Sequence, residues 1–244
     1  MQEVLHGEPR LRRGRQVGGW ELLVAEEETA EAQMALDEEL ARRALPTLRL
    51  FRWARPTISL GFRQSAPAWV EEGRLAASGI DWVERPTGGG IAVHGSDLSC
   101  SVTAPREVRL HALMAGVCES LSEAIRAFGV AASWQAEVEQ SRRIEYCLTE
   151  SSPYAIMAGG RKVCGLAIRR YPHSWLVQGS LLLHRLPAVF ERVMPPAVWE
   201  SFVTRAVSLD EVSGRVIEQT ELISRIVSGF GLQDDTMIRE GCAC

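Results

Sequence analysis

Residues 85–99 read RPTGGGIAVHGSDLS, and this stretch decides how the chain is organised. A run typical of a strand, IDWVER at 80–85, leads into it, and segment 97–104 alternates apolar residues with Ser and Thr, the period of a half-buried strand. Three successive glycines expose backbone N–H groups and let a ligand approach the chain closely. The sequence therefore predicts a hairpin around the glycines, whose turn is either a tight connection or a ligand-binding loop.

Other extended runs also come in groups. LRLFRW at 48–53 and TISLGF at 57–62 are separated by Pro56, and we expect a hairpin or two adjacent strands there. Three further runs between residues 154 and 183 predict an antiparallel meander, because glycines and a Tyr-Pro-His turn interrupt them. Since strands and helices do not alternate regularly, the predicted fold class is α+β, with a mixed, largely antiparallel sheet flanked by helices.

Helical patterns occupy the segments between these strands. Segment 29–45 is rich in helix formers and has Thr29 in position to cap its first turn. Segment 111–129 carries apolar residues at helical spacing and stops at Gly129, so we expect it to be the longest helix. Shorter helices are predicted at 67–78, near 187–194 and, with an amphipathic pattern, from about 215 to 230.

The composition is that of a folded chain. Apolar residues make up 46% and charged residues 24%, which excludes a disordered, collagen-like or coiled-coil protein. We expect one domain at 19–235, a flexible polar leader at 1–18 and a tail at 236–244. No run of 18 apolar residues and no export signal is present, so we expect a cytoplasmic protein without a membrane partner. The net charge of −4 also argues against nucleic acid as a partner.

The six cysteines are widely scattered, and we expect them to be reduced thiols. Cys147 precedes a stretch rich in Ser, Thr and Pro, which places it in a loop or at the start of a strand, where a neighbouring cation would make it nucleophilic. No two histidines have metal-ligand spacing, and Cys242 and Cys244 offer only two ligands on a tail, so we predict no metal site. The cysteines at apolar positions, which we expect to pack in the core, are Cys100, Cys118 and Cys164.

Lys162 is the single lysine of a chain with 26 arginines, so either chance has kept it or arginine cannot replace it there. Within GGRKVCGLAIRR, residues 159–170, a regular strand would place Lys162 on one face with Cys164, Leu166 and Ile168. Burial in such an apolar layer would lower the pKa of the lysine side chain, which could then act as a general acid/base or a charge-stabilising donor. The alternative is a solvated lysine at the edge of a sheet.

Several short motifs occur in a fixed order between residues 19 and 210. They are MALDE at 34–38, ISLG at 58–61 with Gln64, RPTGG at 85–89 continuing to Ala92-Val93-His94, GRK at 160–162 and QGSL at 178–181. As an ordered set they resemble the biotin/lipoate A/B protein ligase family. The resemblance implies the catalytic fold shared by biotin ligases and class II aminoacyl-tRNA synthetases, in which the glycine loop and the lysine surround an acyl chain and its activated carbonyl.

Cys147, the SSPY run at 151–154 and the GRK motif together resemble the LipM-type octanoyltransferase branch of that family. The branch implies two-step transfer: the Cys147 thiolate takes an octanoyl group from acyl carrier protein, and a lysine of a lipoyl-domain protein then takes it from the thioester. Lys162 would stabilise the thiolate or the oxyanion and shuttle protons, and N–H groups of residues 87–90 would help to hold the oxyanion. This chemistry implies no cofactor and no metal.

The resemblance also implies partners and further site residues. The acceptors would be lipoyl-domain proteins such as the glycine cleavage H protein and the E2 subunits of 2-oxoacid dehydrogenases. The chain departs from the family pattern within Gly165-Leu166-Ala167-Ile168 and within Val177-Gln178-Gly179-Ser180, which leaves octanoyl, lipoyl and other acyl groups open. The alternative functions are an ATP- and Mg²⁺-dependent lipoate ligase without its accessory domain and a non-catalytic module that binds carrier protein. The implied substrate-binding residues are Arg85, Thr87, Gly88, Gly89, Gly90, His94, Gly165, Gln178 and Gly179.

Overall fold

The computed structural model describes residues 16–17, 19–25, 27–137 and 144–232. The strands are β1 Gln16–Val17, β2 Trp20–Val24, β3 Thr47–Phe51, β4 Thr57–Leu60, β5 Asp81–Glu84, β6 Ala92–His94, β7 Asp97–Pro105, β8 Ala132–Trp134, β9 Ile156–Ala158, β10 Arg161–Arg170 and β11 Ser174–Leu182. The helices are α1 Ala30–Arg43, α2 Glu72–Ala77, α3 Leu110–Arg126, α4 Val189–Val193, α5 Pro196–Arg205, α6 Leu209–Ser213 and α7 Gln219–Gly229.

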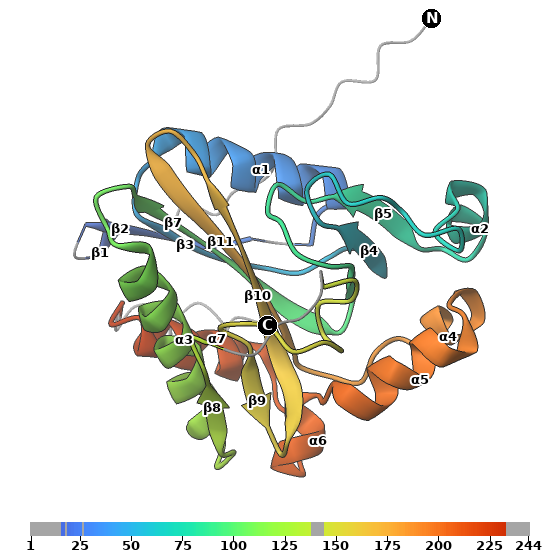
Figure 1. The fold of residues 1–244 in the computed structure, drawn as a ribbon. Helices are drawn as coiled ribbons and strands as arrows, with labels where there is room; N and C mark the ends of the chain where they lie inside the picture. Colours follow the sequence, from blue (N-terminus) through green and yellow to red (C-terminus); the bar gives the residue numbers. More distant parts are fainter. Residues whose placement is uncertain (1–15, 18, 26, 138–143, 233–244) are drawn as a thin grey trace, which may run out of the picture.

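The strands form one sheet of eight strands, in the order β1-β2-β3-β7-β11-β10-β9-β8, and one of three strands, in the order β5-β4-β6. Among the strands named above, β2 with β3 and β4 with β5 pair in parallel, and the other pairs are antiparallel. The predicted α+β class with a largely antiparallel sheet is therefore confirmed. In Figure 1, α1 lies along one side of the large sheet, and α3 and α7 lie along the other.

The core of the molecule lies between the eight-stranded sheet and the α3–α7 pair. Alternate residues of β7, among them Cys100 and Val102, pack there against Val117 and Leu121 of α3. The intervening residues of β7 are also buried, because Ser99 and Ser101 are each only 2% exposed. The expectation of a half-buried strand was therefore wrong about the polar face, which is covered by α1 instead of by water.

A buried ion pair holds α1 on that polar face. Asp37 of α1 accepts hydrogen bonds of 2.6 Å from Arg49 of β3, from Ser101 of β7 and from Gln178 of β11. Burial lowers the pKa of Arg49, and Asp37 opposes that shift. Removing one partner would leave an uncompensated buried charge, at a cost of about 3–5 kcal/mol in unfolding free energy. The pair therefore holds α1 over β3, β7 and β11. Thr29 caps α1 as predicted by accepting a bond from the Ala32 N–H.

Two predicted hairpins are wrong. Residues 47–51 and 57–60 form strands, but β3 lies in the large sheet and β4 in the small one. The glycine stretch does not close a hairpin either, because β4 lies between β5 and β6 and pairs with both. The connection from β5 to β6 therefore passes over the end of β4. There a Cβ on Gly61 would lie 2.1 Å from the Gly89 carbonyl oxygen, so only glycine fits at position 61.

The remaining predictions are largely confirmed. Strands β9, β10 and β11 form the expected antiparallel meander, and α3 is the longest helix of the described residues. Helix α5 was not predicted, although Pro196 suits the first turn of a helix. Residues 16–17, assigned to the leader, pair with β2, whereas residues 1–15 and the tail lie outside the described part of the chain. No helix in the described ranges is long and apolar enough to cross a membrane.

Candidate functional site

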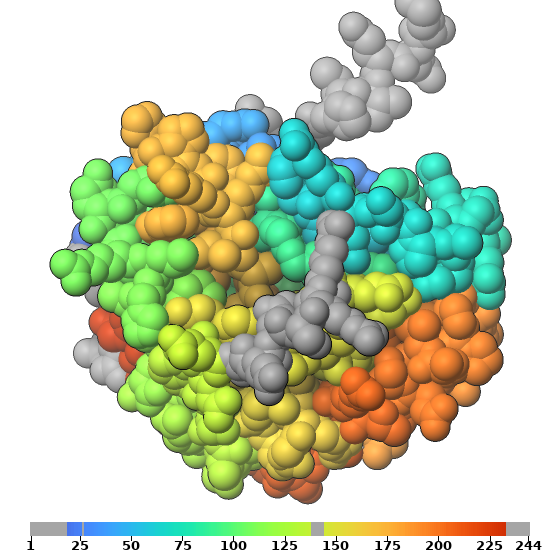
Figure 2. All heavy atoms as spheres, viewed as in Figure 1, coloured from blue at the N-terminus to red at the C-terminus, as the bar shows by residue number. Residues whose placement is uncertain are grey.

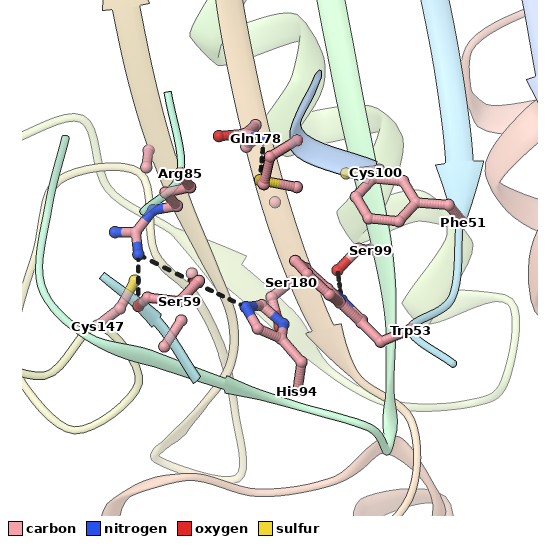
Figure 3. Close-up of a pocket in the computed structure, with 15 residues that line it drawn as sticks. Phe51, Trp53, Ser59, Arg85, His94, Ser99, Cys100, Cys147, Gln178 and Ser180 are labelled. Carbon is pink, nitrogen blue, oxygen red and sulfur yellow. Dashed lines mark hydrogen bonds between the residues drawn. The ribbon is translucent and has the colours of Figure 1, made fainter. Parts of the chain in front are cut away.

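A cavity of about 30 Å³ lies where the polar face of the large sheet meets the small sheet (Figure 3). Its walls come from β4, β6, β7, β10 and β11, together with Met34, Phe51, Trp53, Arg85 and Cys147. A space of this size holds about one water molecule. Met34, which lies in this wall, has a flexible unbranched side chain that is suited to enlarge the space by moving.

Cys147 lies in the loop before β9, as predicted, and its backbone is tied to the glycine stretch. The Cys147 N–H donates to the Ile91 carbonyl over 2.8 Å, and the Ile91 N–H donates to the Glu145 carbonyl over 2.7 Å. A Cβ on Gly90 would lie 2.6 Å from that Glu145 carbonyl, so the close approach requires glycine. The thiol is largely buried, at 9% exposure, and it lines the cavity.

Arg85 organises the glycine loop from the inside. Its guanidinium donates to the carbonyls of Gly88 and Gly90 over 2.8 and 2.6 Å and to the Ser59 carbonyl over 3.0 Å. Thr87 donates to the Gln178 side chain over 2.6 Å, which links the loop to the Asp37 ion pair. Burial lowers the pKa of Arg85, and the adjacent Cys147 opposes that shift. A buried arginine thus lines the same cavity as the thiol.

Lys162 does not share a face with Cys164 and Leu166, contrary to the expectation from regular alternation. A β-bulge between Lys162 and Cys164 shifts the register against β9. Because of the extra residue, the side chain of Lys162 lies on the same face of β10 as Gly165. Cys164 and Leu166 lie on the opposite face, in the core beside α3 and α7. On the Gly165 face the Lys162 ammonium is aimed at the Cys147 loop instead of an apolar layer.

Lys162 is 3% exposed, and its ammonium donates three hydrogen bonds. Its acceptors are the Cys147 carbonyl at 2.7 Å, the Glu150 carbonyl and the Ser152 hydroxyl at 3.0 Å. Burial lowers the pKa of Lys162, and the neighbouring Cys147 is the first of three groups that oppose this shift. Because an ammonium has three donors and no acceptor, these contacts use its full capacity and brace the Cys147 loop.

A second cavity, of about 410 Å³, lies on the other side of this loop and is lined by Lys162. It also borders Trp134, Ser152 and Arg205. On the face shown in Figure 2, the yellow-green surface of the Cys147–Ser152 region lies between the cyan surface that follows β4 and the orange surface of α4 and α5. The loop thus separates a small inner cavity from a larger outer one.

His94 belongs to a buried polar chain that crosses the cavity wall. Its Nδ1 lies 2.8 Å from Asp97 Oδ2, and its Nε2 lies 2.8 Å from Ser59 Oγ. Ser99 and Ser180 donate to the same Asp97 oxygen over 2.8 and 2.7 Å. Burial would by itself raise the pKa of Asp97, but the charge and hydrogen bond of His94 and the two serines outweigh it, so this pKa is lowered.

The other three cysteines of the described residues behave as packing groups. Burial raises the pKa of Cys100 and of Cys118 to about 12 each, and it raises that of Cys164 well above its ordinary value. They stay protonated thiols near neutral pH, as their apolar positions predicted. Cys242 and Cys244 lie outside the described residues. Within those residues no group of three or more His, Cys, Asp or Glu side chains could hold a metal ion.

The structure thus brings most predicted residues to one place. Arg85, His94, Cys147, Gly165, Gln178 and Gly179 line the inner cavity. Thr87 and the three glycines support its edge, and Lys162 lies behind the Cys147 loop. Sequence reasoning missed the roles of Trp53, Ser59, Asp97 and Ser180. Asp97 had a local signal, because it follows His94 by three residues at the start of an expected strand.

Gly165→Ala is expected to lower acyl transfer about 10²-fold, because a Cβ there would lie 2.7 Å from Cys147 Sγ and displace the thiol. We expect a loss of about 1–3 kcal/mol in unfolding free energy as well. Gly116→Ala is the matched control: it lies in α3 with nothing within 4 Å of the new Cβ, and it should be neutral or stabilising. Steady-state transfer and denaturant unfolding measure both effects, and an active Gly165→Ala protein would contradict the contact.

Asp97 is expected to make the protein sensitive to acid. Because its folded pKa lies below the ordinary 3.8, the ionised carboxylate contributes stability that is fully present above 3.8 and is lost as the pH falls through the lower folded value. Asp97→Asn should therefore lose less unfolding free energy than the wild type when the pH is lowered through this range. Denaturant titrations above and below pH 3.8 test this, and equal losses in the two proteins would contradict it.

Comparisons with known proteins agree with the fold and with the motif order. Octanoyltransferase LipM of Symbiobacterium thermophilum is 30% identical over 236 residues, which cover 86% of this chain and 85% of that protein. Octanoyltransferase LipM of Exiguobacterium sibiricum is 29% identical over 237 residues, with the same shares covered. The resemblance found in the sequence is thereby confirmed.

Solved structures share the fold at lower identity. A lipoate-protein ligase A bound with ATP superposes with a TM-score of 0.69 and 24% identity, over 90% of this chain and 84% of that one. The bipartite lipoate protein ligase of Thermoplasma acidophilum gives 0.70 and 20%, over 90% and 82%. The family model of the lipoyl protein ligase A/B catalytic domain matches residues 29–231, which include all the strands named above except β1 and β2. The chain therefore belongs to the lipoyl protein ligase A/B catalytic domain family.

Proposed function

We propose that this protein is an octanoyltransferase of protein lipoylation that works through a thioester on Cys147. In the first step the Cys147 thiolate attacks the thioester of octanoyl-acyl carrier protein, and the carrier thiol leaves. In the second, the lysine amine of a lipoyl-domain protein attacks the octanoyl-enzyme and releases Cys147. The acceptors are the glycine cleavage H protein and the E2 subunits of 2-oxoacid dehydrogenases, and the reaction takes place in the cytoplasm without a cofactor or a metal.

The observation that carries this proposal is the placement of Cys147. Its thiol lines the inner cavity beside Arg85, whose positive charge favours the thiolate, whereas the other described cysteines are held as thiols by burial. Lys162 braces the loop that presents the thiol. The glycine loop is held beside the cavity by Arg85, and we expect its N–H groups to help to hold an oxyanion. The octanoyltransferases among the relatives support the same acyl group.

Mass spectrometry of the intact protein tests the proposal. Incubation with octanoyl-acyl carrier protein and no ATP is expected to add one octanoyl group, which hydroxylamine removes because it is a thioester. Adding a lipoyl-domain protein should then move the group to that protein. Modification of the lipoyl domain only with free octanoate or lipoate plus ATP and Mg²⁺, without an acyl-enzyme, would replace the proposal by a ligase. Binding of carrier protein without any transfer would instead indicate a non-catalytic module.

A further inference from the structure

The turn that carries Cys147 is closed by a carboxylate. The Thr149 N–H donates to the Tyr146 carbonyl over 3.3 Å, which places Cys147 at the second position of the turn. Just before Cys147, the N–H groups of Glu145 and Tyr146 both donate to Glu150 Oε1, over 2.8 and 2.7 Å. The Glu150 side chain thus reaches back across the turn and holds the two residues that lead into the thiol.

Glu150 is joined to Lys162 as well. Its backbone carbonyl accepts a hydrogen bond from the Lys162 ammonium, which also donates to the Cys147 carbonyl over 2.7 Å. Burial lowers the pKa of Lys162, and the neighbouring Cys147, Cys164 and Glu150 oppose this shift. Burial holds Cys164 as a thiol, so it carries no charge near neutral pH. The Glu150 carboxylate is thus a negative charge that acts on the lysine from the same short turn as the nucleophile.

The charges around the outer cavity single out the same residue. Among the described residues that line this cavity, Glu150 is the one carboxylate, and Lys162, Arg161 of β10 and Arg205 of α5 are the cations. Arg161 is paired with Glu211 of α6. Both arginines stay protonated at any ordinary pH. Lys162 is therefore the cation of this wall that can lose its charge, and Glu150 is the acid that lines the same cavity.

We propose that Glu150 is a positioning residue for both Cys147 and Lys162: its carboxylate holds the turn that presents the thiol and supplies the negative charge beside the lysine. A lysine that moves protons must be able to lose and regain one near neutral pH. Burial alone favours the neutral amine, and a nearby carboxylate favours the ammonium. The inference rests on the proposed function, because it takes Cys147 as the nucleophile and Lys162 as the group that shuttles its protons.

Lys162 can be observed by itself, because it is the single lysine of the chain. Lysine isotopically labelled at Cε therefore gives one side-chain signal in NMR spectra, and its pH titration needs no acyl donor. Glu150→Gln keeps a side-chain oxygen that can accept from Glu145 and Tyr146, but it removes the charge. We expect the Lys162 signal to reach its midpoint at a lower pH in this variant than in the wild type, since less opposes the effect of burial.

Transfer assays test the turn. Glu150→Ala removes both hydrogen bonds and the charge, so octanoyl transfer should fall about 10²-fold, with the loss in kcat because the thiol is displaced. Glu150→Gln should be about tenfold more active than Glu150→Ala, because it supplies the oxygen that holds the two N–H groups. Such a rescue by the conservative variant separates the hydrogen bonds from the charge.

Glu71 is the matched control. Its carboxylate also accepts from two backbone N–H groups, those of Gly73 and Arg74 over 3.0 and 2.9 Å, but it caps α2 and lines neither the inner nor the outer cavity. Glu71→Gln and Glu71→Ala should leave both the Lys162 titration and octanoyl transfer unchanged. An equal shift of the lysine signal in Glu71→Gln would show that the effect is not specific to Glu150 and would contradict the proposal.

Two further results would overturn it: a folded Glu150→Gln protein whose lysine signal titrates as in the wild type, and a folded Glu150→Ala protein with full transfer. If Glu150→Ala does not fold, the titration of Glu150→Gln decides the matter. If the wild type forms no octanoyl-enzyme but Glu150→Gln lowers the titration midpoint of Lys162, the proposed function fails and the link between Glu150 and Lys162 stands.

Discussion

Cys147→Ala is expected to reduce octanoyl transfer by about 10⁴-fold or more, because the acyl-enzyme can no longer form. The fold should survive, since this thiol lies in a loop and the backbone hydrogen bond from Cys147 to Ile91 does not depend on the side chain. The measurement is steady-state transfer from octanoyl-acyl carrier protein to a lipoyl domain, with intact mass spectrometry for the adduct. Cys147→Ser should also be inactive, because a serine hydroxyl at this position is a much weaker nucleophile than a thiolate.

Cys118→Ala provides the matched control. Cys118 is fully buried in the α3–α7 core, and its high pKa of about 12 keeps it a thiol. Its loss should cost about 1 kcal/mol of unfolding free energy and no activity. The two variants thus separate chemistry from packing. An octanoyl adduct on the Cys147→Ala protein would show that another cysteine, or another residue, is the nucleophile.

Lys162→Arg is expected to be nearly as inactive as Lys162→Met, with transfer reduced about 10²- to 10³-fold or more in both. Three acceptors surround a single Nζ atom, and a planar guanidinium cannot place three N–H groups at one point. In the Met variant the acceptors lose their partner entirely, and we expect a loss of about 3 kcal/mol in unfolding free energy. Cys147 alkylation should be faster in the Arg variant than in the Met variant, because the positive charge is kept.

Arg161→Ala is the neighbouring control for Lys162. Arg161 is about one-third exposed and bonds to Glu211 on the surface, so its removal should change transfer little. Near-full turnover by Lys162→Arg would show that charge alone matters at this position, and the bracing role would then be wrong. Normal transfer by Lys162→Met would exclude both roles together.

The parts of the fold that were predictable are the local ones. The meander of β9, β10 and β11 is marked by turn residues between successive strands, and α1 is marked by the Thr29 cap, so neighbours in sequence settle both. The partners of β4 could not be predicted in this way. Its parallel neighbour β5 begins at Asp81, and α2 lies between the two strands, so a short-range pattern favoured the wrong pairing with residues 48–53.

The site shows the same division. Cys147 and the glycine stretch could be located because small residues and a loop thiol are unusual in their surroundings. The Ser59–His94–Asp97 chain could not, because its members come from β4, β6 and β7 and only the pairing of β4 with β6 brings Ser59 to His94. The partners of Lys162 were hidden for another reason: they depend on a bulge in the pairing of β10 with β9, which no local sequence pattern marks.

That bulge makes the length of β10 as important as its composition. Side chains on a strand follow a two-residue parity, and the extra residue near Val163 reverses the parity between the two ends of β10. Straightening the bulge with every residue kept would turn Lys162 towards the apolar core while Gly165 still faced Cys147. Deleting Val163 would instead leave Lys162 two residues before Gly165, and a regular strand would keep the two on one face. A redesign of this strand therefore has to keep either the bulge or the two-residue spacing that replaces it.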